Sequence, residues 1–284
     1  VFFIHQDPKG RDLLPVQHAY IRDHITRFED VMYSENYKDR ETGYRAYVDF
    51  VSFVDYYIIN ELSRNLDGYR ISTFLHKDKD SKGGKITMGP YWDYNICFGN
   101  ANFFAAGQTA GWIVDGMGDA DGYAMPFWWG KLRLDPFFNS VLKRRWNEWK
   151  ETYINTSYLN QFIDSCAASL GDAQKRNFRV WDVLGVHVWP NNYVGGTYVN
   201  ELNYLKNWLR DRITWMDSQI QPIVDVTVGV EDAPALVFDL VTTPNPFPDG
   251  LLFKFFLPRE SQFDLSIRDI TGREVYRYSG RLQE

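Results

Sequence analysis

The chain has 284 residues, of which 44% are apolar and 17% aromatic, and its 31 basic and 37 acidic side chains give a net charge of −6. A chain of this size buries most of its unfolded surface, so these values exclude intrinsic disorder and a scaffold that depends on disulfides. The excess of acidic side chains argues against nucleic acid as a partner. The sequence contains no run of about 18 apolar residues, so no transmembrane segment is predicted.

The first part of the chain carries two helical patterns. Apolar side chains between Pro15 and Met32 approximate a helical stripe. From Tyr44 to Leu62 apolar residues recur at intervals of three and four, and the following Arg64-Asn65 is typical of a helix end. The second helix therefore leads into the segment Asn65-Leu66-Asp67-Gly68.

A β-hairpin is predicted next. Residues from Arg70 to His76 alternate in polarity, Lys85 to Met88 form a second short β run, and a charged turn that ends in glycine lies between them. The second arm leads into Gly89-Pro90-Tyr91-Trp92-Asp93-Tyr94-Asn95. Asp67 and Asp93 therefore stand at the two ends of one hairpin.

The middle of the chain begins with a glycine-rich stretch over residues 99–124, which predicts a long irregular loop of the kind that is commonly functional. Helical patterns then cover Asp135 to Trp149, about Ser157 to Arg176, and Tyr198 to Ile220. After Gln221 the helical period is lost, and short β runs follow at residues 236–241, 251–257, 263–267 and 274–278.

We therefore predict an α+β fold in three parts. Residues 1–220 form a mainly helical domain with one β-hairpin, residues 221–236 form a linker, and residues 237–284 form part of an all-β, sandwich-like module. That module has about half of the ~100 residues of a β-sandwich, and the first four residues read as a strand already under way. We expect the chain to be a piece of a longer protein.

Asp67 and Asp93 are the strongest candidates for chemistry. Paired carboxylates either share a cation or divide acid and base roles. Ser72 and Asn95 add neutral oxygen atoms near them, which favours the oxygen-only surroundings that Mg²⁺ or Mn²⁺ prefers. From spacing alone, both carboxylates could equally cap the turns in which they stand.

A glycosidase is a further interpretation, with the two carboxylates as acid and nucleophile and tryptophans as a sugar platform. The tryptophans that would form this platform are Trp92, Trp112, Trp128 and Trp129. Most aromatic residues of the chain fall at helical spacing, however, and such aromatics are more often core residues than ligand platforms.

The residues around both carboxylates resemble a known family. The resemblance rests on Asn65-Leu66-Asp67-Gly68-Tyr69 and on Gly89-Pro90-Tyr91-Trp92-Asp93-Tyr94-Asn95-Ile96-Cys97-Phe98-Gly99. Support comes from Ser52-Phe53-Val54-Asp55-Tyr56, Pro126-Phe127-Trp128-Trp129, Arg145-Trp146 and Leu205-Lys206-Asn207-Trp208-Leu209-x-x-Arg212. Over residues 1–220 the chain resembles the CotH family of spore-coat-type atypical protein kinases, and Trp-Asp-x-Asn-x-x-Phe-Gly is the specific part.

This resemblance implies a kinase-like fold, of which the chain would be the carboxy-terminal lobe. It implies that Asp67 takes the place of the catalytic aspartate, and that Asp93, with Asn95 and Ser72, holds the Mg²⁺ or Mn²⁺ that bridges the phosphates of ATP. The acceptor would be a serine or threonine of a protein substrate. Phosphoryl transfer needs these parts, because a carboxylate must lie beside the acceptor and a cation must neutralise the phosphates.

The chain departs from the family pattern at three places. The family commonly has Asn at the position of Ser72, its members often have Asp at the position of Asn95, and its amino-terminal lobe would precede Val1. We therefore expect the chain by itself to lack kinase activity. The alternative is a catalytically silent surface protein that keeps the fold and binds a partner or a glycan.

The tail carries a second resemblance. Pro244-Asn245-Pro246-Phe247 and the stretch from Phe263 to Val275 resemble the first half of a type IX secretion carboxy-terminal sorting domain. This resemblance implies recognition by the type IX secretion machinery, export across a Gram-negative outer membrane, and a secreted or cell-surface protein.

Overall fold

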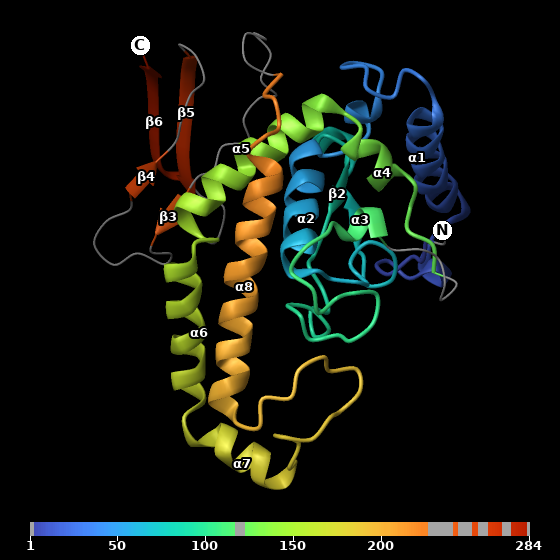
Figure 1. The fold of residues 1–284 in the computed structure, drawn as a ribbon. Helices are drawn as coiled ribbons and strands as arrows, with labels where there is room; N and C mark the ends of the chain where they lie inside the picture. Colours follow the sequence, from blue (N-terminus) through green and yellow to red (C-terminus); the bar gives the residue numbers. More distant parts are fainter. Residues whose placement is uncertain are drawn as a thin grey trace. The chain divides into compact units, whose positions relative to one another are not determined.

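A computed structural model of the chain describes residues 3–116, 123–226, 241–243, 252–254, 261–268 and 274–282. The chain divides into two compact units, residues 1–228 and 229–284. Figure 1 shows the elements. The helices of the first unit are α1 (Pro15–Tyr33), α2 (Phe50–Ser63), α3 (Ile113–Gly116), α4 (Trp128–Arg133), α5 (Pro136–Thr152), α6 (Thr156–Leu170), α7 (Asp172–Val180) and α8 (Tyr198–Ile220). Its strands are β1 (Leu75–Lys77) and β2 (Ile86–Met88).

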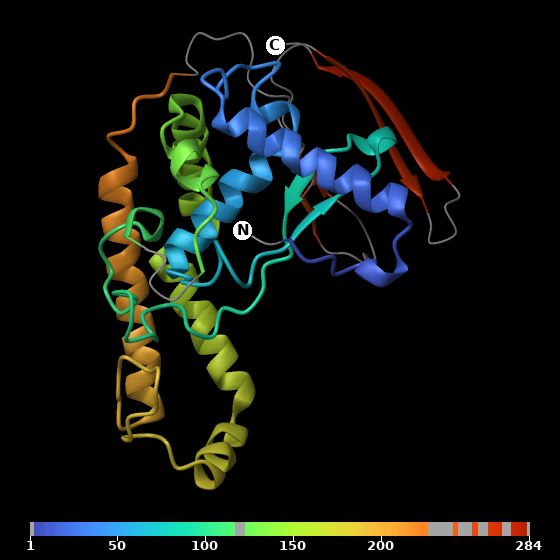
Figure 2. The same ribbon diagram turned by 90° about the vertical axis from the view of Figure 1, so that its right-hand side faces the viewer.

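Helix α2 is the centre of the first unit. Ten of its 14 residues are buried, as expected of a helix that is apolar on most sides. It packs against α5, α8 and β2, and Figures 1 and 2 show it between α8 and the β1–β2 hairpin. The largest buried side chains around it are aromatic, among them Phe53, Tyr56, Tyr57, Trp129 and Trp146.

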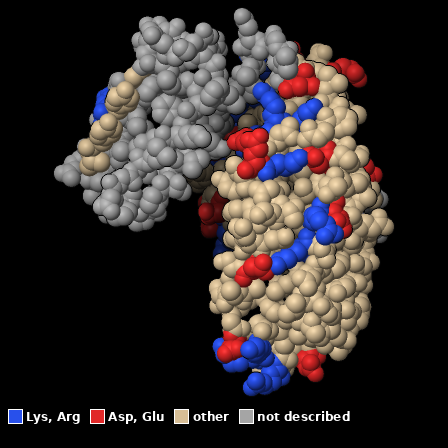
Figure 3. All heavy atoms as spheres, turned by 60° about the vertical axis from the view of Figure 1, so that its left-hand side comes forward, with Lys and Arg blue, Asp and Glu red and all other residues tan. Residues whose placement is uncertain are grey.

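Helices α6 and α8 run side by side, and α7 follows α6 at the far end of this pair (Figures 1 and 2). Neither α6 nor α7 has a buried residue. Ion pairs such as Lys206–Asp164 and Lys150–Asp217 connect α8 to its neighbours. On the face shown in Figure 3, basic and acidic side chains accordingly lie next to one another.

The β1–β2 hairpin is antiparallel and in the register Leu75–Met88, His76–Thr87 and Lys77–Ile86. Ile86 also fastens the hairpin to the start of α2. Its carbonyl accepts the amide of Asp49 at 2.7 Å, and its amide donates to the carbonyl of Tyr47 at 2.8 Å. The hairpin is thereby fixed to the helix that precedes Asp67.

In the second unit, two strand pairs are described. Strand β3 (Val241–Thr243) pairs antiparallel with β4 (Leu252–Lys254), and β5 (Ser261–Arg268) pairs antiparallel with β6 (Glu274–Leu282). The turn signals Pro244-Asn245-Pro246 and Thr271-Gly272-Arg273 lie outside the described residues, as does most of the stretch 236–241. A sandwich-like module over residues 237–284 stays a prediction.

The sequence patterns for α1, α5 and α8 are confirmed within a few residues. The predicted second helix begins later than expected, because the Asp49 side chain accepts the Ser52 amide and caps the helix at Phe50. The helix expected over Ser157 to Arg176 is two helices, since Gly171, with φ +47°, separates α6 from α7.

The hairpin is confirmed, but its first strand covers only Leu75–Lys77. Residues 66–72 form turns instead of continuing the strand. None of the helices in the described ranges combines the length and apolar character needed to span a bilayer.

Asp217 on α8 provides a test of the packing of α8 against α5. Its Oδ1 accepts hydrogen bonds from Trp146 Nε1 at 3.0 Å, Lys150 Nζ at 2.6 Å and Gln221 Nε2 at 2.9 Å. Burial acts to raise the pKa of Asp217, but these hydrogen bonds outweigh it and hold the pKa below the ordinary value of 3.8. The stabilisation is therefore complete at neutral pH and is lost as the pH falls through the lowered pKa.

We predict that Asp217→Asn lowers the free energy of unfolding by about 1–2 kcal/mol at pH 7. The difference from wild type should shrink at an acidic pH below the lowered pKa, where the wild-type carboxylate is protonated. Urea unfolding at both pH values measures this. Asp211→Asn, at a side chain that is 52% exposed, is the control and should change little. An equal loss at both pH values would contradict the prediction.

Candidate functional site

The turn that carries Asp67 begins where α2 ends. Arg64 takes the left-handed conformation, with φ 51° and ψ 50°, and so terminates the helix. The side-chain oxygen of the buried Asn65 then accepts the amides of Asp67 and Gly68, each at 3.1 Å. An asparagine that bonds the backbone two and three residues ahead fixes such a turn locally. Asp67 is thereby held directly beyond the helix.

Gly68 is required at this turn. Its carbonyl accepts hydrogen bonds from the Tyr56 hydroxyl at 2.7 Å and the Thr73 hydroxyl at 2.8 Å. A Cβ atom at this position would lie 2.0 Å from Asn60 Oδ1, so a larger residue would force the turn away from α2. The structure thus holds the turn from both sides.

The Asp67 carbonyl places Ser72. It accepts the amides of three residues, Arg70 at 3.1 Å, Ile71 at 2.9 Å and Ser72 at 3.1 Å. Ser72 is half-buried and lies within the same compact turn. The sequence prediction that Ser72 lies near Asp67 therefore agrees with the fold.

Arg70 contacts the Asp67 carboxylate, a role that the sequence analysis missed. Its Nη2 lies 3.5 Å from Asp67 Oδ1, and its Nε and Nη1 donate to the carbonyls of Leu66 and Tyr123 at 3.1 and 3.2 Å. The Arg70 side chain is only 2% exposed, whereas that of Asp67 is 26% exposed. The guanidinium therefore orients the carboxylate from behind and leaves part of it open.

Asp93 is held by the two aromatic residues that precede it. Tyr91 stacks on Tyr56 of α2 with ring centroids 5.5 Å apart, and Trp92 packs edge-on against Phe74 at 6.1 Å. Asp93 itself is exposed and has a φ of 61°. This conformation is uncommon for residues other than glycine, although aspartate and asparagine tolerate it best.

The two carboxylate segments meet at Asn60 of α2. Its Oδ1 accepts the Tyr94 hydroxyl at 3.1 Å, and the same oxygen borders the backbone of Gly68. Its Nδ2 donates to the carbonyl of Tyr56 at 3.1 Å, which fixes the orientation of the amide. One buried side chain therefore joins the segment of Asp93 to the turn of Asp67.

Both carboxylates act on one buried thiol, that of Cys97. Burial is the largest cause that raises the pKa of Cys97, to about 12, and the charges of Asp67 and Asp93 act in the same direction. Charges shift the pKa of a group in this way when they lie near it. The charges of Asp67 and Asp93 thus both reach the Cys97 thiol.

The donors near the two carboxylates are oxygen atoms. Asp67 and Asp93 supply carboxylates, while Ser72 and Asn95 supply a hydroxyl and an amide oxygen close to them in the chain. Asn95 is exposed, and its carbonyl accepts Asn100 Nδ2 at 2.9 Å. Within the described ranges no group of three or more His, Cys, Asp or Glu residues could together hold a metal ion. Two carboxylates with neutral oxygens fit Mg²⁺, which usually takes only one or two carboxylates and completes its shell with water and phosphate.

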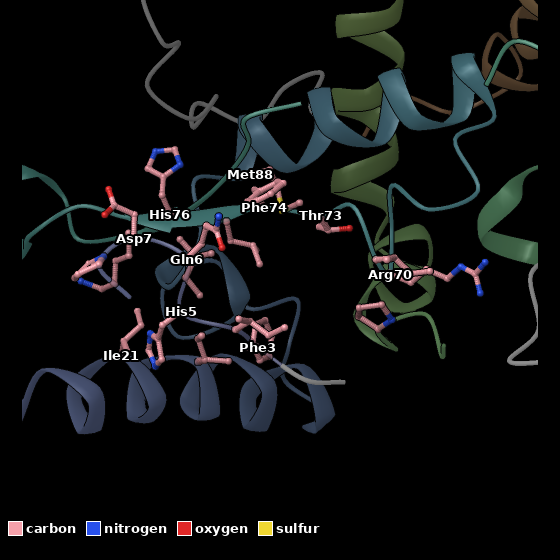
Figure 4. Close-up of a pocket in the computed structure, with 18 of the residues that line it drawn as sticks. Phe3, His5, Gln6, Asp7, Ile21, Arg70, Thr73, Phe74, His76 and Met88 are labelled. Carbon is pink, nitrogen blue, oxygen red and sulfur yellow. The ribbon is translucent and has the colours of Figure 1, made fainter. Parts of the chain in front are cut away.

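A pocket of about 550 Å³ lies beside the turn. Residues 3–8, α1 and the β1–β2 hairpin enclose it, and Figure 4 shows apolar side chains such as Phe3, Ile21 and Phe74 in its walls. Thr73 and Arg70 lie at one end in this view. The volume is within the range of roughly 300 to 1,000 Å³ that small-molecule sites occupy.

Behind the site, Glu61 of α2 and Arg212 of α8 form a fully buried ion pair, with Arg212 Nη2 and Glu61 Oε2 3.3 Å apart. Arg212 also donates to the carbonyls of Glu61, Thr109 and Gly111. Burial raises the pKa of Glu61 and lowers that of Arg212, and the charge of each partner opposes the shift of the other.

The Glu61 carboxylate and the Arg64 guanidinium also bond the loop that follows Asp93. The Glu61 carboxylate accepts the amides of Ile113 and Val114 at 2.8 and 3.0 Å, at the start of α3. Arg64 Nη1 donates to the carbonyls of Ala110 and Gly111 at 2.7 and 2.5 Å. We refer to Glu61, Arg64 and Arg212 as the buried charge network. The sequence signals for it are that Arg212 falls within the apolar pattern of α8 and ends the segment Leu205–Arg212 that supports the family resemblance.

Comparison with known proteins gives one match. A family model described as CotH kinase protein matches residues 5–216 of the chain. No curated protein and no solved structure matches it. The matched region contains both carboxylates, the hairpin between them and the buried charge network.

The buried charge network predicts a large effect of Arg212→Met. The variant would leave the Glu61 carboxylate buried without its cation, which costs about 3–5 kcal/mol. Arg210→Met on the same helix is the control, since the Arg210 side chain is 53% exposed and should contribute less than about 1 kcal/mol. Urea unfolding measures both. If the two variants unfold alike, the network does not hold the helices together.

Proposed function

Because the chain belongs to the CotH kinase protein family, we propose that its site takes part in metal-dependent transfer of a phosphoryl group from ATP to a serine or threonine of an acceptor protein. The observation that carries the proposal is that the turn of Asp67 and the segment of Asp93, which flank one hairpin, meet at the buried Asn60 of α2. Neither carboxylate is buried, so both are available to ligands.

The proposed roles follow from how each side chain is held. Asp67, oriented by Arg70 and partly open, would accept the proton of the acceptor hydroxyl or orient that hydroxyl. Asp93 would hold Mg²⁺ or Mn²⁺ together with Asn95 and Ser72. When bound, the cation would neutralise charge on the phosphates of ATP. The fixed turns around Asn65 and Gly68 keep the carboxylates in place without reorganisation.

The pocket beside the turn supports a nucleotide as the second ligand. Its walls are largely apolar, which suits a nucleobase, and Thr73 and Arg70 at one end connect it to the Asp67 turn (Figure 4). A nucleotide with its base seated there could extend its phosphates toward the Asp67 turn.

A protein that binds a partner without catalysis is the second candidate. Tyr91 and Trp92, next to Asp93, are 47% and 59% exposed, and exposed aromatics of this kind are frequent at contact surfaces. The replacement of the family's Asn and Asp by Ser72 and Asn95 also favours this candidate. Binding of a divalent cation at the carboxylates distinguishes the two.

We predict that the chain binds Mn²⁺ and that Asp93→Asn weakens this binding by at least about tenfold. Asparagine is chosen because it tolerates the left-handed conformation of residue 93. Asp78→Asn, an exposed carboxylate in the turn of the same hairpin, removes the same charge and is the control. Titration followed by electron paramagnetic resonance measures the free Mn²⁺.

The same variant tests the transfer step. In the longer protein that we expect to contain this chain, supplied with labelled ATP and Mn²⁺, Asp93→Asn should abolish the transfer of label to protein serine or threonine, and Asp78→Asn should not. Retained transfer in Asp93→Asn would exclude the assigned metal role. A wild-type chain that takes up no Mn²⁺ would favour the non-catalytic binding protein.

For the tail we propose that residues 237–284 act as a sorting signal for type IX secretion, so that the protein is secreted or held at the outer cell surface. The support is the resemblance of Phe263 to Val275, together with the antiparallel pairing of β5 and β6. We predict that deletion of residues 237–284 retains the protein inside cells that possess the machinery. Fractionation and immunoblotting measure this, and normal export of the shortened protein would contradict it.

A further inference from the structure

The segment that follows Asp93 and Asn95 is fastened to α2 on one side. The amide of Phe98 donates to the carbonyl of Ser63 at 2.7 Å, one residue before Arg64 ends the helix. The side chain of Asn100 reaches back and donates to the carbonyl of Asn95 at 2.9 Å. The position of Asn95 therefore depends on where residues 98–100 lie.

On the other side, residues 98–107 rest on α8 (Figure 2). The Tyr204 hydroxyl donates to the carbonyl of Gly99 at 2.9 Å, and Trp208 Nε1 donates to the carbonyl of Gly107 at 3.0 Å. Gly99 has a φ of +82°, and a Cβ atom there would lie 2.4 Å from Trp208 Cδ1. The approach of the segment to α8 is thus close enough to require glycine.

The loop that leads into α8 completes this arrangement. The amide of Asn192 donates to the carbonyl of Asn100 at 2.6 Å, and the amide of Asn102 donates to the carbonyl of Pro190 at 2.9 Å. The side chain of Asn192 also donates to the Tyr204 hydroxyl at 3.2 Å. The ring of Tyr193 stacks on that of Tyr204, with centroids 4.2 Å apart.

Tyr204 is therefore the residue at which the segment after Asp93, the loop before α8 and α8 itself meet. Its hydroxyl donates to Gly99 and accepts from Asn192, so it bonds both the segment after Asp93 and the loop before α8. It stands near the start of α8, and its ring is fixed by Tyr193. Removing the hydroxyl alone would release both Gly99 and the Asn192 side chain while the ring packing stays.

We propose that Tyr204 is a positioning residue for the metal-binding segment Asp93–Asn95, acting through Gly99 and Asn100. The inference rests on the proposed function, because it assigns the segment a divalent cation. Tyr204 contacts neither carboxylate. Its contribution is to keep residues 98–100 against α8, so that the positions of Asn95 and Asp93 stay fixed relative to α2.

The experiment compares the full chain with Tyr204→Phe and with Tyr198→Phe as the control. Tyr198 lies on the same helix, and its ring contacts Phe178. We expect Tyr204→Phe to raise the dissociation constant for Mn²⁺ by about two- to tenfold, the scale of one lost hydrogen bond. Hydrogen exchange should become faster at the amides of residues 98–102, with the thermal unfolding midpoint nearly unchanged. Tyr198→Phe should match wild type in all three measurements.

The outcomes separate the inference from the proposed function. If wild type binds Mn²⁺ and Tyr204→Phe binds it equally well, the inference is overturned and the proposed function stands. An equal loss of affinity in Tyr198→Phe would show a general effect on α8 and would also overturn it. If wild type binds no Mn²⁺ at all, the metal site fails, and the inference falls with it.

Discussion

Glu61 on α2 and Arg212 on α8 meet in the interior, with neither side chain exposed. A charge without a partner there would cost several kcal/mol, so each residue depends on the other being in place. Arg212 donates as well to backbone carbonyls of residues 109 and 111, while Glu61 accepts the first amides of α3. Two helices distant in the sequence and the loop between them are therefore fixed by one set of contacts.

The buried pair of Glu61 and Arg212 also determines where the candidate site lies. Glu61 lies in the last turn of α2, and the chain reaches Arg64, Asn65 and Asp67 within six residues of it. The loop that the network holds at residues 105–114 is the continuation of the segment that carries Asp93. Both carboxylates are thus attached to the same end of α2, one through a turn and the other through Asn60 and the loop.

Local patterns predicted the elements that local interactions determine. The stripes of α1 and α8 gave their bounds within a residue or two, and the carboxylates at the ends of the hairpin were selected from residue type and position. The interruption of the helix at Gly171 was missed because one glycine in an apolar pattern does not by itself show a break. The late start of α2 depends on Asp49, whose capping role is visible only in the structure.

Contacts between residues that are distant in the chain could not be predicted from the sequence patterns. Nothing in the neighbourhood of Glu61 indicates that its partner stands 151 positions later, and the same holds for Tyr204 and Gly99. The contact of Arg70 with Asp67 was missed for a different reason. It depends on the turn geometry that Asn65 and Gly68 impose, which the residue pattern does not specify. Metal binding by Asp93, Ser72 and Asn95 remains a proposal, which rests on the convergence of the Asp67 and Asp93 segments at Asn60.

The most direct test of that proposal is a crystal structure of the chain grown with Mn²⁺ and ATP, with anomalous diffraction data collected at the manganese edge. The account predicts an anomalous peak at the carboxylate of Asp93, with oxygen ligands that include Asn95 and Ser72 at roughly 2.0 to 2.2 Å. A map in which the Asp93 carboxylate is ordered and satisfied by protein groups, with no peak beside it, would contradict it.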